Sequence, residues 1–395
     1  MRWICLLGPS PGGARAATLH GRELVVLVPP GVAVPAEVAR HASRVVFGGI
    51  TRYEEARETV DRLTAELGPP ELLLSFTEYA QETCARIATE LGLPSVSPQA
   101  AAMTRDKARM RHALACTPYA WPYVTGTARE VADAVTASPE GTAWIVKPVD
   151  GAGSGGVAAL GSRAAVADWL GGADGTQLYI AEHEAGGPEF SVEAVSAAGE
   201  HTILAVTAKQ TTGSPGFVET GHVVPAPLDD RETGLLHTAV RCVLDTLGIE
   251  FGASHTEVRL DPGHGPVVIE THTRVGGDCI PELVELATGA DQYERSVAAL
   301  LGTAPALTAE PAAGAAAIAF VVPPVPGRLR GLVTGAAEGV VRWEFEHGIG
   351  ADIAPVRSSA DRLGYVLVSG AGPAEAAERA AKAVAAVDVV VDDRV

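Results

Sequence analysis

Two glutamates past the middle of the chain have the sequence context of a paired metal site. Glu257 lies in the strand-like segment SHTEVRL and Glu270 in PVVIETHTR, with the turn-forming sequence DPGHG between them. Antiparallel strands joined by that turn place both carboxylates side by side on one face. Such carboxylates repel unless a divalent cation holds them, and Mg²⁺ completes its shell with phosphates and water. Arg274 adds a forked donor for a phosphate or carboxylate. The alternative is a pair of surface acids neutralised by this arginine.

A glycine-rich turn follows a lysine-bearing strand earlier in the chain. The strand-like segment WIVKP contains Lys147, and residues 151–156 read GAGSGG before the chain continues as a strand. Backbone N–H groups of such a turn can approach phosphate oxygens while the ammonium offsets their charge. The order differs from a P-loop, in which the lysine follows the glycines and opens a helix. We therefore expect the tip of a β-hairpin that folds over a ligand; a hairpin that binds nothing is the alternative.

The chain of 395 residues is acidic, with a formal net charge of −18, and only four of its 30 basic residues are lysines: Lys107, Lys147, Lys209 and Lys382. Nucleic acids and anionic membranes would be repelled by such an exterior, whereas a small anion can bind in a local cationic cleft. Five scattered cysteines indicate neither a disulfide framework nor a zinc site. Since the sequence has no apolar run of membrane-spanning length, we expect a cytoplasmic protein that binds neither nucleic acid nor membrane.

The elements that would position these residues divide the chain into three parts. Residues 1–98 alternate strand-like and helical segments, which predicts a parallel sheet covered by helices on both faces. Residues 99–300 are expected to form a central α+β core, with a lid subdomain over approximately residues 118–182. Residues 301–395 are expected to form a small α+β lobe. The predicted class is therefore α/β with an α+β core.

Local patterns predict the main elements of the two later parts. Helices are expected over residues 99–115, 229–247 and 281–301, and residues 306–317 have the composition of a linker. Strands are expected on both sides of the turn at residues 151–156 and in the segments that carry Glu257 and Glu270.

Taken together, the order of these pieces resembles the ATP-grasp superfamily over nearly the whole chain. The helix RDKARMR at residues 105–111 resembles the family's phosphate-lysine helix. The resemblance implies that two lysines contact the phosphates of ATP and that the glycine-rich turn covers these phosphates. It also implies that the backbone of a hinge segment binds adenine and that a carboxylate binds the ribose hydroxyls. The implied ATP-binding residues are Lys107, Lys147, Gly153, Ser154, Gly155, Gly156, Glu182, Ala185 and Glu189. It also implies Mg²⁺ or Mn²⁺ at Glu257 and Glu270. The layout resembles biotin-carboxylase-like members, with an N-terminal parallel domain, a nucleotide-binding domain with a lid, and a C-terminal lobe.

Within the superfamily the sequence is most similar to the L-amino-acid ligases, which join a carboxylate to an amine and make dipeptides. The likeness is carried by residues 76–98, the segment FVETGH at 217–222 and the run RVGGD at 274–278. It implies catalytic roles for Arg274, His222 and Glu219. The implied substrate pocket comprises Glu78, Lys209, Glu219, His222, Gly276, Gly277 and Asp278. Alternatively, His222 is a surface residue of a loop between strands, and Asp278 caps a helix that begins near Pro281.

One position departs from the family pattern. The second metal strand of the family reads E-x-N, and here the third position is His272. An imidazole is a poor ligand for Mg²⁺ compared with a carbonyl oxygen. Either the metal relies on water and Glu270, or His272 faces elsewhere, and the number of metal ions is left open.

The resemblance implies a reaction in which a carboxylate takes the γ-phosphoryl group of ATP and an amine then displaces phosphate from the acyl phosphate. Such catalysis rests on positioning and charge rather than on a protein nucleophile. Two alternatives remain: a biotin-carboxylase-like or purine-pathway enzyme, and a non-catalytic nucleotide-binding regulator. A dehydrogenase is excluded because the glycine fingerprint is missing. The identity of the acid and amine, a role in antibiotic biosynthesis and a homodimeric state are not fixed by the sequence.

Overall fold

The computed structural model describes residues 2–213, 217–305 and 310–392. Its N-terminal part is a parallel sheet in the order β3-β2-β1-β4, as the sequence predicts. The strands are β1 (Trp3–Leu7), β2 (Glu23–Val28), β3 (Arg44–Phe47) and β4 (Leu72–Leu74), and the helices are α1 (Pro11–Leu19), α2 (Ala36–His41), α3 (Tyr53–Leu67) and α4 (Gln81–Glu90). Alternate residues of β1 enter separate cores. Trp3 and Leu7 pack in the core that includes α3 and α4, while Ile4 packs in the one that includes α1.

The lid is a small antiparallel sheet in the order β5-β8-β6-β7. Its strands are β5 (Tyr123–Thr127), β6 (Trp144–Pro148), β7 (Ala158–Ala159) and β8 (Leu178–His183), and its helices are α7 (Ala128–Ala137) and α8 (Arg163–Gly172). A shared apolar core holds these helices against the sheet. Because β6 pairs with β7, the glycine-rich turn is at the end of a β-hairpin, and this prediction is confirmed.

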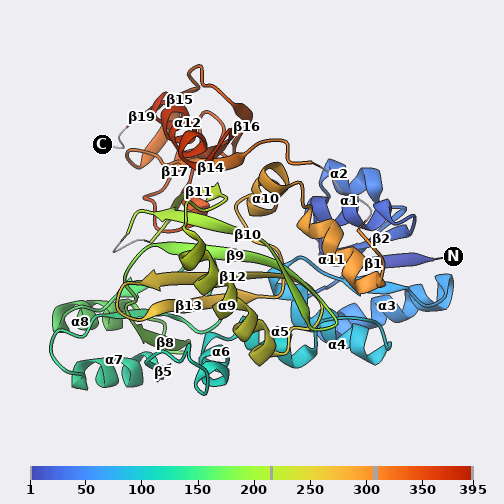
Figure 1. Cartoon of the computed structure of the whole chain (residues 1–395), viewed down its shortest axis with the longest axis horizontal. Coiled ribbons are helices and arrows are strands. Elements are labelled where there is room, and N and C mark those ends of the chain that lie inside the picture. The colour runs from blue at the N-terminus through green and yellow to red at the C-terminus, as the bar shows by residue number, and fades with distance from the viewer. Residues whose placement is uncertain (1, 214–216, 306–309, 393–395) are drawn as a thin grey trace.

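An eight-stranded antiparallel sheet in the order β13-β12-β9-β10-β11-β14-β18-β16 forms the centre of the molecule (Figure 1). Its strands are β9 (Glu189–Ala197), β10 (Glu200–Thr211), β11 (Glu219–Val224), β12 (Gly252–Asp261), β13 (Gly265–His272), β14 (Ala315–Val321), β16 (Val340–Phe345) and β18 (Gly364–Gly370). The long helix α9 (Asp230–Leu247) packs on one face through Leu236, Val240 and Val243. Strands after residue 301 therefore extend the central sheet through the β11–β14 pair.

The remaining C-terminal elements lie close to the last strands of that sheet, and α12 shares a core with β14 and β18 (Figure 1). They are a three-stranded sheet of β15 (Gly327–Val333), β17 (Asp352–Ile353) and β19 (Asp388–Asp392), the short helix η2 (Ser359–Asp361), and α12 (Pro373–Ala385). Of the linker predicted at 306–317, residues 306–309 lie outside the described residues, and the prediction is wrong from Ala315, where β14 begins. None of the helices in the described part of the chain has the length and apolar character needed to cross a membrane.

Two predicted helices are each divided in the structure. The segment 99–115 forms α5 (Pro98–Arg105) and α6 (Lys107–Leu114), because Asp106 is extended and its carboxylate accepts hydrogen bonds from the backbone N–H groups of Ala108 and Arg109. The segment 281–301 forms α10 (Ile280–Thr288) and α11 (Gln292–Leu301), separated by Gly289 with φ 73° and by the N-cap Asp291. The single-helix predictions were wrong at both places. At Asp106 helix-compatible side chains continue on both sides of the break, whereas at the second break the sequence carries a helix-ending glycine, Gly289, and an N-capping aspartate, Asp291, which the prediction overlooked.

Replacing Asp106 by alanine should lower the free energy of unfolding by about 1 kcal/mol, because α6 loses its N-cap. Asp106→Asn keeps a side-chain oxygen acceptor and should remain close to wild type in urea-denaturation midpoint. Equal destabilisation by both substitutions would contradict the capping role.

Candidate active site

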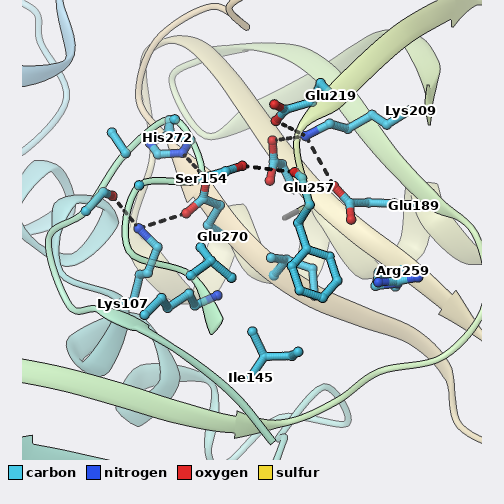
Figure 2. A pocket seen from close by; sticks show the side chains of 18 of the residues that line it. Lys107, Ile145, Ser154, Glu189, Lys209, Glu219, Glu257, Arg259, Glu270 and His272 are labelled. Carbon is cyan, nitrogen blue, oxygen red and sulfur yellow. Dashed lines mark hydrogen bonds and ion pairs between the residues drawn. The ribbon is translucent and has the colours of Figure 1, made fainter. Parts of the chain in front are cut away.

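A cleft of about 240 Å³ lies between the β5-β8-β6-β7 sheet and the central sheet, with Ser359 of η2 at its edge, and it contains most of the residues predicted from sequence (Figure 2). The predicted residues that line it are Lys107, Lys147, Gly153, Ser154, Gly155, Glu182, Ala185, Glu189, Lys209, Glu219, His222, Glu257, Glu270, Arg274, Gly277 and Asp278. Gly156, Glu78 and Gly276 are not among its lining residues.

Glu257 and Glu270 are directly paired across β12 and β13, so the predicted side-by-side placement is confirmed. Lys209 Nζ contacts Glu257, and Lys107 Nζ is 2.9 Å from Glu270 Oε2 (Figure 2). Burial alone would raise the pKa of each carboxyl, but the ammonium of Lys209 lowers the pKa of Glu257 and that of Lys107 lowers the pKa of Glu270. Both glutamates are therefore anionic near neutral pH, with a lysine in place for each.

A histidine that also lines the cleft contacts each of these glutamates. His255 Nε2 is 3.3 Å from Glu257, and its Nδ1 is 3.0 Å from the buried carboxylate of Glu193. His272 Nε2 is 3.1 Å from Glu270, and its Nδ1 is 3.2 Å from Glu78. Both ring nitrogens of His272 thus face carboxylates. His272 lines the cleft and does not face elsewhere, which favours the alternative in which a metal relies on Glu270 and water.

Both imidazoles are held in the charged form. Burial would lower the pKa of His255, but Glu193 and Glu257 raise it to about 9. The pKa of His272 is likewise raised by Glu270 and Glu78 against the effect of burial. The two rings stack with centroids 6.1 Å apart. The positive charge of these imidazoles therefore reduces the electrostatic repulsion between Glu257 and Glu270.

Two residues assigned to the substrate pocket lie behind the cleft wall instead. Glu78 contacts Arg274 and His272, and these groups bring its pKa to about 2 although burial would raise it. It lines a separate depression beside Arg105. Gly276 packs so closely against His255 that an added Cβ would lie 2.9 Å from Nδ1. Glu78 therefore supports Arg274, and Gly276 provides space for the ring of His255.

Lys209 lies at the centre of an acidic cluster, a position that its place in the sequence does not indicate. Besides Glu257, its ammonium is 3.2 Å from Glu189 and 3.7 Å from Glu219 (Figure 2). Burial would lower the pKa of Lys209, but the three carboxylates raise it well above its usual value. One cation facing three anions leaves this part of the cleft with excess negative charge.

Lys147 and the glycine-rich turn form the opposite wall. Lys147 Nζ is 2.7 Å from Glu182, which also contacts Arg111. Arg111 is almost completely buried and was assigned no role from sequence, although it lies one helical turn after Lys107. The carbonyl oxygen of Gly151 accepts a 2.7 Å hydrogen bond from Lys107 Nζ, and Ser154 Oγ donates to the carbonyl of Phe217 at 3.2 Å. The turn therefore lies across the cleft.

A bulge explains how Glu219 and His222 both line the cleft from β11. Residues three apart on a regular strand face opposite sides. Here Gly221 pairs with Gln210 but Glu219 pairs with Thr211, so one extra residue shifts the alternation. His222 is 1% exposed, so its alternative placement in a surface loop is wrong.

Asp278 contacts His222 and the C-terminal part of the chain rather than capping a helix. Its Oδ2 is 3.2 Å from His222 Nε2, and Arg362 donates to its two oxygens at 2.6 and 2.9 Å. Helix α10 has Cys279 as its N-cap, with no side-chain capping bond, which overturns the capping alternative. Ser359 donates to the carboxylate of Glu219. Ser359 and Arg362 were missed, because a residue so far along the sequence has no spacing signal linking it to the site.

The carboxylate pair suits a hard divalent cation that also binds phosphate. Glu257 and Glu270 offer oxygen donors, the ligand type that Mg²⁺ prefers. Within the described residues no group of three or more His, Cys, Asp and Glu side chains is arranged to hold a metal ion. The donor set therefore fits a cation that keeps water and substrate oxygens in its shell, and it does not fit a closed structural metal site.

Two family matches cover separate parts of the chain. Residues 140–282 match the ATP-grasp domain family, so this part of the chain is an ATP-grasp domain, and the predicted resemblance to that superfamily is confirmed. Residues 319–392 match the family described as L-amino acid ligase C-terminal domain 2, which places its C-terminal domain with that of the L-amino acid ligases.

Individual proteins agree with this assignment. Alanine--anticapsin ligase of Bacillus subtilis (strain 168) is 33% identical over 95 residues, covering 24% of this chain and 20% of that protein. Carnosine synthase 1 of Gallus gallus is 31% identical over 207 residues, covering 49% and 21%. The chain thus spans about one fifth of the length of these relatives. The crystal structure of an L-amino acid ligase from Bacillus licheniformis superposes with a TM-score of 0.83 at 20% identity, covering 100% of this chain and 99% of that chain, which shows the shared fold.

The charge on His255 predicts a pH-dependent stability of the ligand-free protein. Its folded pKa of about 9 exceeds the ordinary value of 6.5, so its contribution is complete below pH 6.5 and is lost as the pH rises through 9. The free energy of unfolding should fall by at most ~3 kcal/mol over this window from this residue. His255→Gln should flatten the profile in urea titrations at a series of pH values.

His264 provides the matched control because it lies in the same hairpin but is exposed. His264→Gln should leave the pH profile of stability unchanged. A His255→Gln profile that superposes on that of wild type would show that the buried imidazole is not charged.

Proposed function

We propose that the protein is an ATP-dependent ligase that joins a carboxylate to an amine through an acyl phosphate, releasing ADP and phosphate. The observation that carries this proposal is the cross-strand pair Glu257 and Glu270, which faces buried lysines beneath a glycine-rich turn. Opposed carboxylates and ammonium groups in one cleft suit a ligand that brings both phosphates and a divalent cation.

The residues of the cleft divide between nucleotide and metal. We assign Lys107 and Lys147 to the phosphates, with the N–H groups of residues 153–156 above them, and the stretch from Glu182 to Ala185 and Glu189 to the nucleoside. Glu257 and Glu270 would hold Mg²⁺ or Mn²⁺. When bound, that cation supplies positive charge against the phosphate oxygens.

The chemistry requires two displacements. A carboxylate oxygen forms a bond to the γ-phosphorus of ATP while the bond from that phosphorus to the β–γ bridging oxygen breaks, and ADP leaves. The amine nitrogen, after losing a proton, then forms a bond to the acyl carbon while the bond from that carbon to the phosphate oxygen breaks. Negative charge develops on oxygen in both steps, so fixed positive groups contribute most.

We assign to Arg274 the stabilisation of that charge. It lines the cleft, and its guanidinium is fixed by Glu78 and by a 2.7 Å hydrogen bond to the carbonyl of Val275. A guanidinium held in place loses little freedom when an oxyanion forms beside it. The glycine-rich turn would shield the acyl phosphate from water. His222 could accept a proton from the incoming ammonium.

The names of the relatives support amino acids as substrates. Alanine--anticapsin ligase joins an amino acid to a second small molecule by its name, and the structural match is an L-amino acid ligase. We therefore propose an amino acid or analogue as the carboxylate, a dipeptide-like amide as the product, and a role in antibiotic biosynthesis in the cytoplasm.

The test is a phosphate-release screen over pairs of amino acids with ATP and Mg²⁺, followed by mass spectrometry of the products. Bicarbonate is included as an acceptor because a biotin-carboxylase-like enzyme would use it. A new amide that depends on both partners supports the proposal, and phosphate release with bicarbonate alone contradicts it.

Glu270→Ala and Arg274→Ala should each lower amide formation by about 10²- to 10³-fold, because each removes charge placed for the transition state. Arg330→Ala, which removes an exposed ion pair to Asp392, is the control and should retain full activity. Near wild-type turnover in either cleft variant would overturn the role assigned to that residue.

Lys147→Met should weaken ATP binding by about 10- to 100-fold in calorimetry, since a charge-assisted phosphate contact is lost. Lys382→Met is the matched control, because Lys382 is exposed and pairs with Glu378 on the same helix, α12. Equal ATP affinity in the two variants would rule out a phosphate contact for Lys147.

A further inference from the structure

His222 presents one unsatisfied ring nitrogen at the substrate end of the cleft. Its Nε2 is 3.2 Å from Asp278, while Nδ1 is buried and has no hydrogen-bond partner among the described residues. A carboxylate can only accept, so in the neutral imidazole Nε2 carries the proton and Nδ1 is the acceptor. Burial would raise the pKa of Asp278, but His222 and Arg362 lower it, which keeps this residue an acceptor.

Asp278 is itself held by the C-terminal part of the chain. The guanidinium of Arg362 makes a two-pronged contact with its carboxylate and lies 3.6 Å from the centre of the Phe320 ring. Asp278 and Cys279 both have positive φ, 51° and 57°, a backbone conformation that costs non-glycine residues about 1–2 kcal/mol each. A side chain on such a backbone needs an external partner to keep its place.

Two residues with hydrogen-bond acceptors therefore line the same cleft. The carboxylate of Glu219 and Nδ1 of His222 come from β11, and both residues line the cleft. Two residues of the C-terminal part of the chain hold these acceptors in place. Ser359 donates a hydrogen bond to Glu219, and Arg362 donates to Asp278, which contacts His222. A pair of acceptors, one of them anionic, recognises a group with several N–H donors and positive charge.

We propose that Arg362 is a positioning residue from the C-terminal domain: it holds Asp278, which orients His222 so that Nδ1, together with Glu219, receives the ammonium group of an α-amino-acid substrate. The identity of this substrate rests on the proposed function, whereas the orientation of His222 does not. Asp278 in this arrangement serves the imidazole and is not a binding site for a cationic side chain.

Arg342 offers a matched comparison. It also reaches from the C-terminal strands to the region of α10, where it makes a two-pronged contact with Glu282 at 2.9 and 2.8 Å, and it lies over Tyr365. It does not line the cleft. Arg342 also contacts Cys279 Sγ at 3.7 Å, but its loss leaves the contacts of Arg362 with Asp278 and of Asp278 with His222 in place.

The first measurement is the protonation pattern of His222 by NMR with ¹⁵N-labelled histidine, its signal being assigned by its loss in His222→Gln. The wild-type protein and Arg342→Ala should show the Nε2–H form. Arg362→Ala should show a mixture of both neutral forms, and Arg362→Lys a partial return to the wild-type pattern. An unchanged Nε2–H form in both Arg362 variants would overturn the positioning role, whether or not the protein is a ligase.

The second measurement is discrimination between an amino acid and its deamino analogue, with L-alanine and propanoate as first probes. The ratio of their kcat/KM values should fall at least tenfold in Arg362→Ala through KM for the amino acid, with the KM for ATP unchanged. Arg342→Ala should keep the wild-type ratio. An equal loss in both alanine variants would mean a structural role only, and a wild-type ratio near one would overturn ammonium recognition.

Failure of the proposed function gives a different result. A wild-type protein that forms no amide with any pair in the screen contradicts ligase activity, while the histidine spectra still decide whether Arg362 orients His222. If Arg362→Ala does not fold, Arg362→Lys carries both measurements.

Discussion

The arrangement of the cleft follows from the cost of burying carboxylates. Glu257 and Glu270 are paired across two strands, and neither can remain charged there without compensation. Lys107 and Lys209 form ion pairs with these carboxylates, and His255 and His272 contact them as well. The histidines in turn require Glu193 and Glu78. Alternating charges therefore extend from the cleft into the protein, and each member depends on the next.

Some contacts of the site could be predicted from the sequence, and others could not. Positions that depend only on a short hairpin were predictable. Examples are the pairing of Glu257 with Glu270 and the glycine-rich turn at the end of a hairpin. The break at Asp106 was not, because helix-compatible residues run on both sides of it. The position of Lys209 among three carboxylates depends on the order of β9, β10 and β12 in the sheet. The contact of Arg362 with Asp278 depends on β18 being part of the same sheet. Those contacts are set by strand order, which local spacing does not encode.

The continuity of the central sheet changes how the C-terminal part is understood. Strands β14 and β18 extend the sheet that carries Glu219 and His222, so their connections reach the cleft directly. The match of residues 319–392 to an L-amino acid ligase domain then concerns residues that touch the site, not a remote appendage. A domain of this kind can alter substrate choice without altering the nucleotide-binding residues, because it contacts a different end of the same cleft.

The ion pairs of the lysines have a consequence for an enzyme that makes an acyl phosphate, as proposed here. Such an intermediate acylates free amines, and the amines nearest to it would be the protein's own. Neighbouring carboxylates raise the pKa of Lys107 and Lys209 against the effect of burial, so both nitrogens stay protonated and lack the lone pair that attack requires. The carboxylates that accompany these lysines would thus protect the protein from self-acylation and leave the substrate amine as the competent nucleophile.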